Sequence, residues 1–176
     1  AIIDTSKTGT AGSVAAGSTN RIYISKRGPV FALVSGTATK SVGVSGVSSS
    51  TGTGTIKFTV TAKGGDLYVS SSDTLIMRVF SSGTASGASV PQQGSLDTYS
   101  VDGATLSSGN HTISQDATAT FTVSATITST SWDTNNNAPY DWRIIGFQWH
   151  GASTVSTTFL DDLNTNPFKT NTVYLP

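Results

Sequence analysis

Hydrophobic and polar residues alternate along two long segments of the chain. In residues 56–63 apolar side chains occupy every second position, with Lys and Thr between them, and residues 120–128 repeat the pattern with Thr and Ser. Successive side chains of a strand point to opposite faces, so each segment is predicted to be a strand with one buried face. We expect six of these side chains to lie in the core: Ile56, Phe58, Val60, Phe121, Val123 and Ile127.

Further strands are predicted around these two. Residues 30–34 form an uninterrupted apolar run, which predicts a strand covered on both faces, and residues 142–149 and 171–176 have strand composition. Turn signals at Gly28-Pro29 and at Asp102-Gly103 predict a break and a short hairpin. About eight to ten short strands separated by turns indicate an all-β chain with a single β-sandwich or jelly-roll-like domain.

The first 20 residues differ from the rest, because they are small, polar and rich in Gly, without a helical period. We therefore divide the chain into an N-terminal extension, residues 1–20, and a sandwich domain, residues 21–176. The extension is interpreted either as a flexible tail or as an extended strand that needs a partner.

The composition excludes several classes of function. Charged residues make up only 11% of the chain, the net charge is zero and no basic patch is visible, so nucleic-acid binding is not expected. The chain has no cysteine, which excludes disulfides and thiolate metal sites. No apolar run approaches the roughly 18 residues of a membrane span. The first residue is Ala, which is most simply read as the result of signal-peptide removal, so we expect an extracellular or cell-surface location.

Catalytic side chains are scarce in the sequence. All ten acidic residues are Asp, and the two histidines, His111 and His150, lie far apart along the chain. No G-x-S-x-G nucleophile motif is present, and the adjacent Asp161 and Asp162 would point to opposite faces of a strand. We predict that the protein is not an enzyme and needs no cofactor.

One polar loop resembles the start of a calcium-binding loop. Its alternate oxygen-bearing side chains are Asp133, Asn135, Asn137 and Asp141. The match fails at the sixth position, where Ala138 replaces the usual Gly. Asn and Asp also favour turns in their own right, so a metal site is retained only as the weaker alternative.

Aromatic residues gather near the same loop. Exposed aromatic rings can stack on sugars, which makes Trp132, Tyr140 and Trp142 candidates for carbohydrate binding. Ile145 and Phe147 mark the opposite face of this strand as the core face, so Trp142 is the better surface candidate. Packing in the core is the more common use of such rings.

The sequence also contains candidate sites for covalently attached sugars. Asn110 begins an N-x-T sequon in a polar turn, where a glycosyltransferase could reach it in a secreted protein. The Ser/Thr-rich loops could carry O-linked sugars, although such loops also serve as plain linkers.

Two segments carry a resemblance to known proteins. Residues 58–69, FTVTAKGGDLYV, and residues 142–149, WRIIGFQW, resemble strands of β-sandwich surface proteins of uncultured bacteria. The chain as a whole looks like the subunits of pilus-like fibrils built by donor-strand complementation. That resemblance implies that the extension leaves its own sandwich and completes a sheet of the next subunit.

We therefore hold two hypotheses of different classes. The first is a structural subunit of an extracellular homopolymer, assembled head-to-tail by insertion of residues from about 5 to 16. Its expected subunit-interface residues are Ile2, Ile3, Thr8, Thr10, Ala11, Val14 and Ala16. The alternative is a carbohydrate-binding or adhesive module of a surface protein.

Overall fold

The computed structural model describes residues 27–43, 50–72, 75–81, 84–85, 96–129, 138–154, 158–163 and 167–175. These residues form twelve β-strands and no helix. The strands are β1 (Gly28–Ser41), β2 (Ser50–Lys63), β3 (Leu67–Ser70), β4 (Leu75–Ser81), β5 (Thr84–Ala85), β6 (Thr98–Asp102), β7 (Thr105–Ser107), β8 (Asn110–Ile113), β9 (Thr118–Ser129), β10 (Ala138–His150), β11 (Thr158–Asp162) and β12 (Val173–Leu175).

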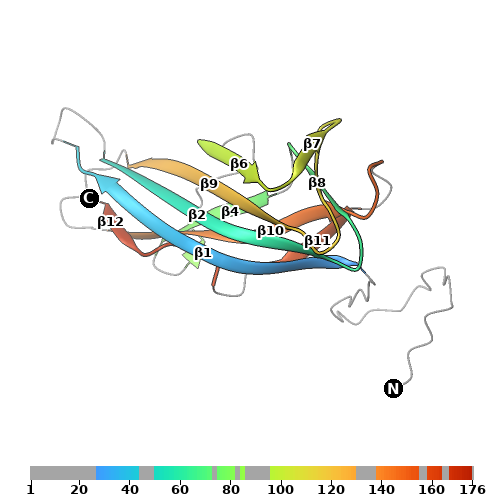
Figure 1. Cartoon of the computed structure of the whole chain (residues 1–176). Coiled ribbons are helices and arrows are strands. Elements are labelled where there is room, and N and C mark those ends of the chain that lie inside the picture. The colour runs from blue at the N-terminus through green and yellow to red at the C-terminus, as the bar shows by residue number, and fades with distance from the viewer. Residues whose placement is uncertain are drawn as a thin grey trace, which may run out of the picture.

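The strands form two antiparallel sheets that pack against each other as a β-sandwich (Figure 1). One sheet has the order β1-β2-β9-β6. The other has the order β5-β4-β10-β3-β8-β7, and β11 and β12 also pair with β10. The all-β fold class predicted from the sequence is thus confirmed.

The core forms where the two sheets face each other. The alternation predicted for β2 and β9 is confirmed, since Ile56, Phe58, Val60, Phe121 and Val123 are fully buried. Ile127 is only half-buried at the edge of the core. The rings of Phe58 and Phe121 stack across the strand pair with centroids 5.3 Å apart, and Phe147 of the opposite sheet meets Phe121 edge-on at the same distance.

Strand β10 changes its buried face part-way along. Trp142 and Ile144 point into the core in its first half, and Phe147 and Trp149 do so in its second half. The switch is produced by a register shift between Ile144 and Gly146 opposite β4, because one extra residue turns the following side chains to the other face. The face assignment that made Trp142 the better surface candidate was therefore wrong, and core packing, held above as the more common use of such rings, is its role.

Two turn predictions were also wrong. Gly28 and Pro29 do not break the chain but begin β1, where they pair with Lys63 and Ala62 of β2. Asp102 and Gly103 do not close a hairpin, because β6 pairs with β9 in one sheet whereas β7 pairs with β8 in the other. A two-residue turn at Ser108 and Gly109, both with positive φ, closes the hairpin of β7 and β8 instead.

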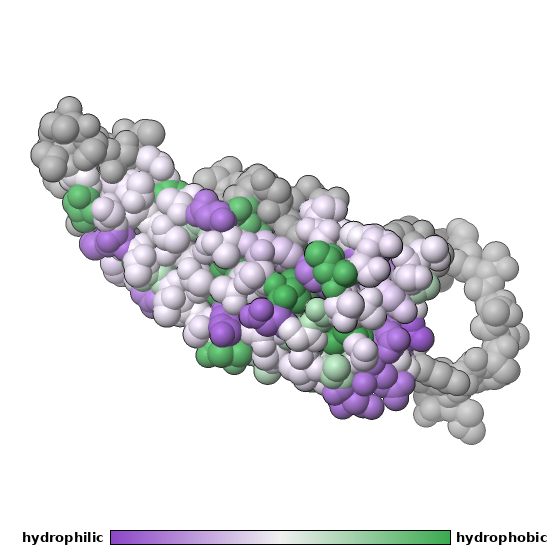
Figure 2. Space-filling model, turned by 45° about the horizontal axis from the view of Figure 1, so that its top comes forward, coloured by the Kyte–Doolittle hydropathy of each residue, from purple (hydrophilic) through white to green (hydrophobic). Residues whose placement is uncertain are grey.

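The outer face of the β1-β2-β9-β6 sheet carries an unusual density of hydroxyl groups. The strand registers align several uncharged rows across the sheet. The face of the molecule in Figure 2 is mostly pale, with scattered hydrophilic and hydrophobic residues. Thr is a favoured strand residue, and its hydroxyl can form hydrogen bonds with water or with neighbouring side chains. One such bond joins Thr53 Oγ1 and Thr126 Oγ1 at 2.8 Å. The rows are Ser41, Thr51 and Thr128; Thr39, Thr53 and Thr126; and Thr37, Thr55, Ser124 and Thr98.

Candidate assembly surface along strand β1

Strand β1 lies at the edge of its sheet. Among the described residues, β2 is the only strand that pairs with it. The apolar run at its start was expected to be covered on both faces, but Val30 and Val34 are each 54% exposed. That expectation was wrong. Pro29 carried the missed signal, since a proline within a strand is typical of an edge.

The outward-facing backbone groups of β1 follow from the pairing on the far side of β2. Ala62 N–H donates to Ala117 and Ala62 C=O accepts from Asp116, so Ala62 directs its backbone toward β9. In an antiparallel ladder the direction of the backbone N–H and C=O groups alternates from one residue to the next. Each residue of β1 opposite Ala62, Val60 or Phe58 therefore directs its N–H and C=O groups away from β2. These residues are Pro29, Phe31 and Leu33.

The sandwich is also incompletely closed beneath this stretch. Phe31 and Leu33 face inward, because paired residues share a face and their partners Val60 and Phe58 are fully buried. Phe31 is nevertheless only half-buried, and Leu33 is 37% exposed. We call residues 29–34 the open stretch of β1; it combines outward backbone groups with partly exposed apolar side chains.

The second half of β1 is held by the C-terminal part of the chain. The Asn171 carboxamide accepts a hydrogen bond from Ala38 N–H at 2.7 Å and donates one to Ala38 C=O at 3.2 Å. Lys40 Nζ donates to the carbonyl of Tyr174 at 3.0 Å. Asn171 thus satisfies both outward backbone groups of Ala38, as a neighbouring strand would, and we call this contact the Asn171 clasp.

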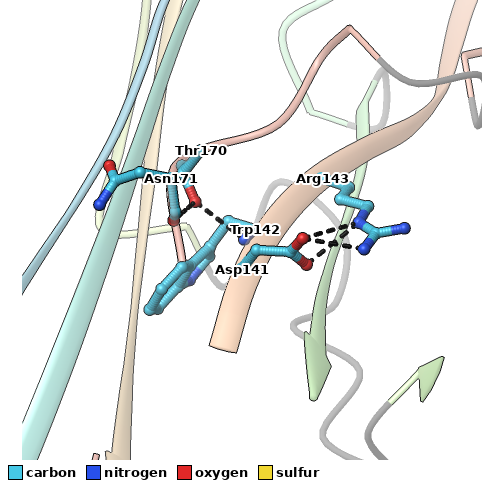
Figure 3. Close-up of polar contacts among 5 residues, drawn as sticks. All are labelled: Asp141, Trp142, Arg143, Thr170 and Asn171. Atoms are coloured by element: carbon cyan, nitrogen blue, oxygen red, sulfur yellow. Dashed lines mark hydrogen bonds and ion pairs between the residues drawn. The ribbon is translucent and has the colours of Figure 1, made fainter. Parts of the chain in front are cut away.

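The clasp is fixed to the opposite sheet by the residue before it (Figure 3). Trp142 N–H donates to Thr170 Oγ1 at 3.1 Å, and Thr170 Oγ1 donates to Asn171 C=O at 2.8 Å. Thr170 N–H returns a hydrogen bond to the carbonyl of Trp142 at 3.0 Å. Trp142 is fully buried, so the residue that precedes Asn171 is bonded to the core.

A register irregularity separates the two halves of β1. Leu33 pairs with Phe58 and Ser35 with Lys57, which leaves Val34 as the extra residue of a bulge. The open stretch therefore ends at this bulge, and the region held by the clasp begins beyond it.

The start of β1 lies beside the end of β10. The Arg27 guanidinium donates to the carbonyl of Gly151, the residue that follows β10, and it packs against Gly65 in the turn after β2. Leu175, by contrast, pairs with Ala138 at the opposite end of β10. The described chain thus begins and ends at opposite ends of a 13-residue strand, roughly 40 Å apart at the usual rise.

The sequence-predicted binding residues fall in several places. The extension residues Ile2, Ile3, Thr8, Thr10, Ala11, Val14 and Ala16 lie outside the described residues, as do Trp132, Asp133, Asn135 and Asn137.

Of the remaining candidates, Trp142 is fully buried and Tyr140 is half-buried against the core. Asp141 is also buried and is paired with Arg143 at 2.8 Å (Figure 3). Asn110 begins β8, where it is half-buried and its side chain donates to Ser153 C=O at 3.4 Å. Its glycosylation stays a prediction.

Two titratable groups, buried His111 and half-buried Asp161, have shifted pKa values. Burial lowers the pKa of His111 below its ordinary 6.5. Burial raises the pKa of Asp161, and a hydrogen bond from Trp149 Nε1 at 2.7 Å opposes part of that increase. His111 packs near the ring of Tyr99, whereas Asp161 lies on β11 next to the stacked rings of Trp149 and Phe159.

The remaining observations concern metal sites, membrane spans and similarity to known proteins. No group of three or more His, Cys, Asp or Glu side chains able to hold a metal occurs among the described residues. Within the same residues, no apolar helix of membrane-spanning length is found. Comparison with protein-family models, with curated proteins and with solved structures found no match for this chain.

Proposed function

We propose that this protein is a structural subunit of an extracellular filament, in which the N-terminal extension of one copy adds a strand to a sheet of the next. The observation that carries the proposal is the open stretch of β1: an outward row of backbone groups beside exposed apolar side chains. Such an edge favours pairing with another chain, because a further strand satisfies the backbone groups and covers the apolar surface together.

The sequence before β1 supplies a suitable strand. It contains 26 residues ahead of Arg27, and residues 5–16 have no proline and a single charged side chain, Lys7. A fully extended chain of this length spans at most about 90 Å, well beyond the length of β10. A neighbouring copy in a head-to-tail arrangement is therefore within reach, and a contact of that kind does not close on itself.

The energetics favour assembly that depends on concentration. Pro29 offers one outward carbonyl, and Phe31 and Leu33 offer two groups each, or about five ladder hydrogen bonds worth roughly 3–7 kcal/mol in total. Burial of a Val or Leu side chain adds at most about 1.5–3 kcal/mol when complete. Association costs roughly 4–15 kcal/mol in lost freedom of motion. The net free energy of association is therefore small, and filaments should dissociate on dilution.

The experiment compares the full chain with a chain that lacks residues 1–16, using negative-stain imaging and sedimentation at matched concentrations. Full-length protein should form filaments, and the truncated protein should remain a folded monomer with the same circular dichroism. A finer variant replaces both Thr10 and Ala11 with Pro. One of two adjacent N–H groups must face the acceptor strand, so the two prolines remove a ladder hydrogen bond in either register and should prevent filament formation. Its control replaces the same two residues with Val, which keeps both N–H groups.

Three results would count against the proposal. Filaments of the truncated chain would show that the extension is not the connecting element, and a monodisperse full-length protein at high concentration would exclude assembly. A closed dimer that exchanges extensions reciprocally would retain strand donation but reject the filament.

The alternative is a carbohydrate-binding module. Its candidate Trp142 is buried, whereas its candidate Trp132 lies outside the described residues. This alternative would be favoured if the full-length protein stayed monomeric and bound a polysaccharide.

A further inference from the structure

We propose that the donated strand pairs with the open stretch of β1 alone, and that the Asn171 clasp sets where this pairing ends. The inference rests on the proposed function and names the acceptor within it. It follows from three features of β1: the outward groups of Pro29, Phe31 and Leu33, the bulge at Val34, and the bonds between Asn171 and Ala38.

Hydrogen-bonding groups limit the acceptor stretch of β1 at both of its ends. Pro29 has no N–H, so the ladder begins there with a carbonyl acceptor only. Beyond the bulge, both outward groups of Ala38 are already bonded to the Asn171 carboxamide. A donor strand that continued along β1 would have to displace this side chain and move the C-terminal segment away from Lys40. The paired length is thus about five or six residues, half of what a strand of residues 5–16 could form.

The occupant is the N-terminal extension of another copy. The extension, residues 1–20, precedes the described strands and is longer than the acceptor needs. Its small, nearly uncharged side chains suit a shallow edge where Leu33 is 37% exposed and Phe31 is half-buried. No charged residue lies within residues 29–34, so the acceptor has no charge to exclude a neutral strand.

Cysteine cross-linking can locate the contact, because the chain contains no native cysteine. An acceptor copy carries Val30→Cys in the open stretch or Thr39→Cys in the clasped half. Both side chains are exposed and share the outer face, since their partners Thr61 and Thr53 lie on the same face of β2. A donor copy, isotopically labelled, carries Thr8→Cys, Thr10→Cys or Ser13→Cys. After mixing, assembly and mild oxidation, mass spectrometry counts disulfides between labelled and unlabelled chains.

The expected result is at least about tenfold more inter-copy disulfide at Val30→Cys than at Thr39→Cys for the best donor position. Adding Asn171→Ala to the acceptor should raise the yield at Thr39→Cys several-fold, because the outward groups of Ala38 become available. Asn171→Gln, which keeps the carboxamide on a longer side chain, is the matched control.

Equal yields at the two positions, or a higher yield at Thr39→Cys in the native background, would overturn the inference. The wild-type protein is imaged in parallel: filaments without links at Val30→Cys reject this acceptor alone, whereas absence of filaments rejects the proposed function itself.

Discussion

The contact between Trp142 and the glycines of β2 provides a sharp test of how the two sheets pack. Trp142 is fully buried, and its ring lies directly over Gly52 and Gly54. A Cβ at Gly54 would overlap the indole, whereas one at Gly52 would lie 2.9 Å from Trp142 Cη2. We therefore expect Gly54→Ala to be destabilising although it adds only a methyl group. Gly28→Ala is the control, because a Cβ there meets nothing within 4 Å.

The magnitudes follow from the packing. Trp142→Ala removes a large buried ring and should cost about 3–5 kcal/mol, and the overpacked Gly54→Ala about 1–3 kcal/mol. With a urea m-value of about 2 kcal/mol/M, the unfolding midpoint should fall by roughly 1.5–2.5 M and 0.5–1.5 M, respectively. Gly28→Ala should change the free energy of unfolding by less than about 0.5 kcal/mol.

The assay is equilibrium urea unfolding followed by circular dichroism, at a protein concentration below which the midpoint no longer changes. The double variant Gly54→Ala with Trp142→Ala should lose less stability than the sum of the single variants, because removal of the ring makes room for the methyl group. An unchanged midpoint for Gly54→Ala, or additive losses, would refute this packing and return Trp142 to the surface as a sugar-binding candidate.

Three further predictions concern single side chains. Asn171→Ala should cost about 1–2 kcal/mol and increase hydrogen exchange at Ala38 N–H at concentrations where the protein is monomeric; unchanged exchange there would contradict the clasp. Because the pKa of His111 is lowered in the folded state, the unfolded chain binds its proton first, and stability should decrease as pH falls below about 6.5; urea titrations at several pH values should lose this step in His111→Gln. Because the pKa of Asp161 is raised, ionisation weakens the fold as pH rises through the acid range; Asp161→Asn should therefore have its largest stabilising effect near neutral pH, and a stabilising effect that appears only in acid would contradict this sign.

The sequence was most informative where burial follows a strict period of two. Ile56, Phe58 and Val60 on β2 and Phe121 and Val123 on β9 are buried as predicted, because each strand is long, regular and covered on one face. Local alternation suffices in such strands, since it depends only on the pleat.

The sequence was misleading where the backbone departs from the regular pleat. The faces of β10 could not be assigned from alternation, because the register shift between Ile144 and Gly146 depends on pairing with a distant strand. Arg143 and Ile145, which simple alternation places on the same face as Phe147, are only half-buried. A bulge is a property of two strands together, and one segment read alone does not reveal it.

The candidate surface was reached only in part from the sequence. The extension could be identified by its composition, but the acceptor could not, because residues 30–34 have the same apolar run that a central strand would show. Pro29 was the one local signal of an edge. The Asn171 clasp joins residues 133 positions apart, and no periodicity predicts a contact of that kind.

The most direct test of strand donation between copies is a structure of the filament at a resolution that shows individual side chains. The account predicts an additional strand beside the open stretch of β1, traced to the N-terminal extension of a neighbouring copy, with the bonds between Asn171 and Ala38 still in place. An open stretch that remains unpaired in the assembly, or one that is paired with the extension of its own chain, would contradict the account.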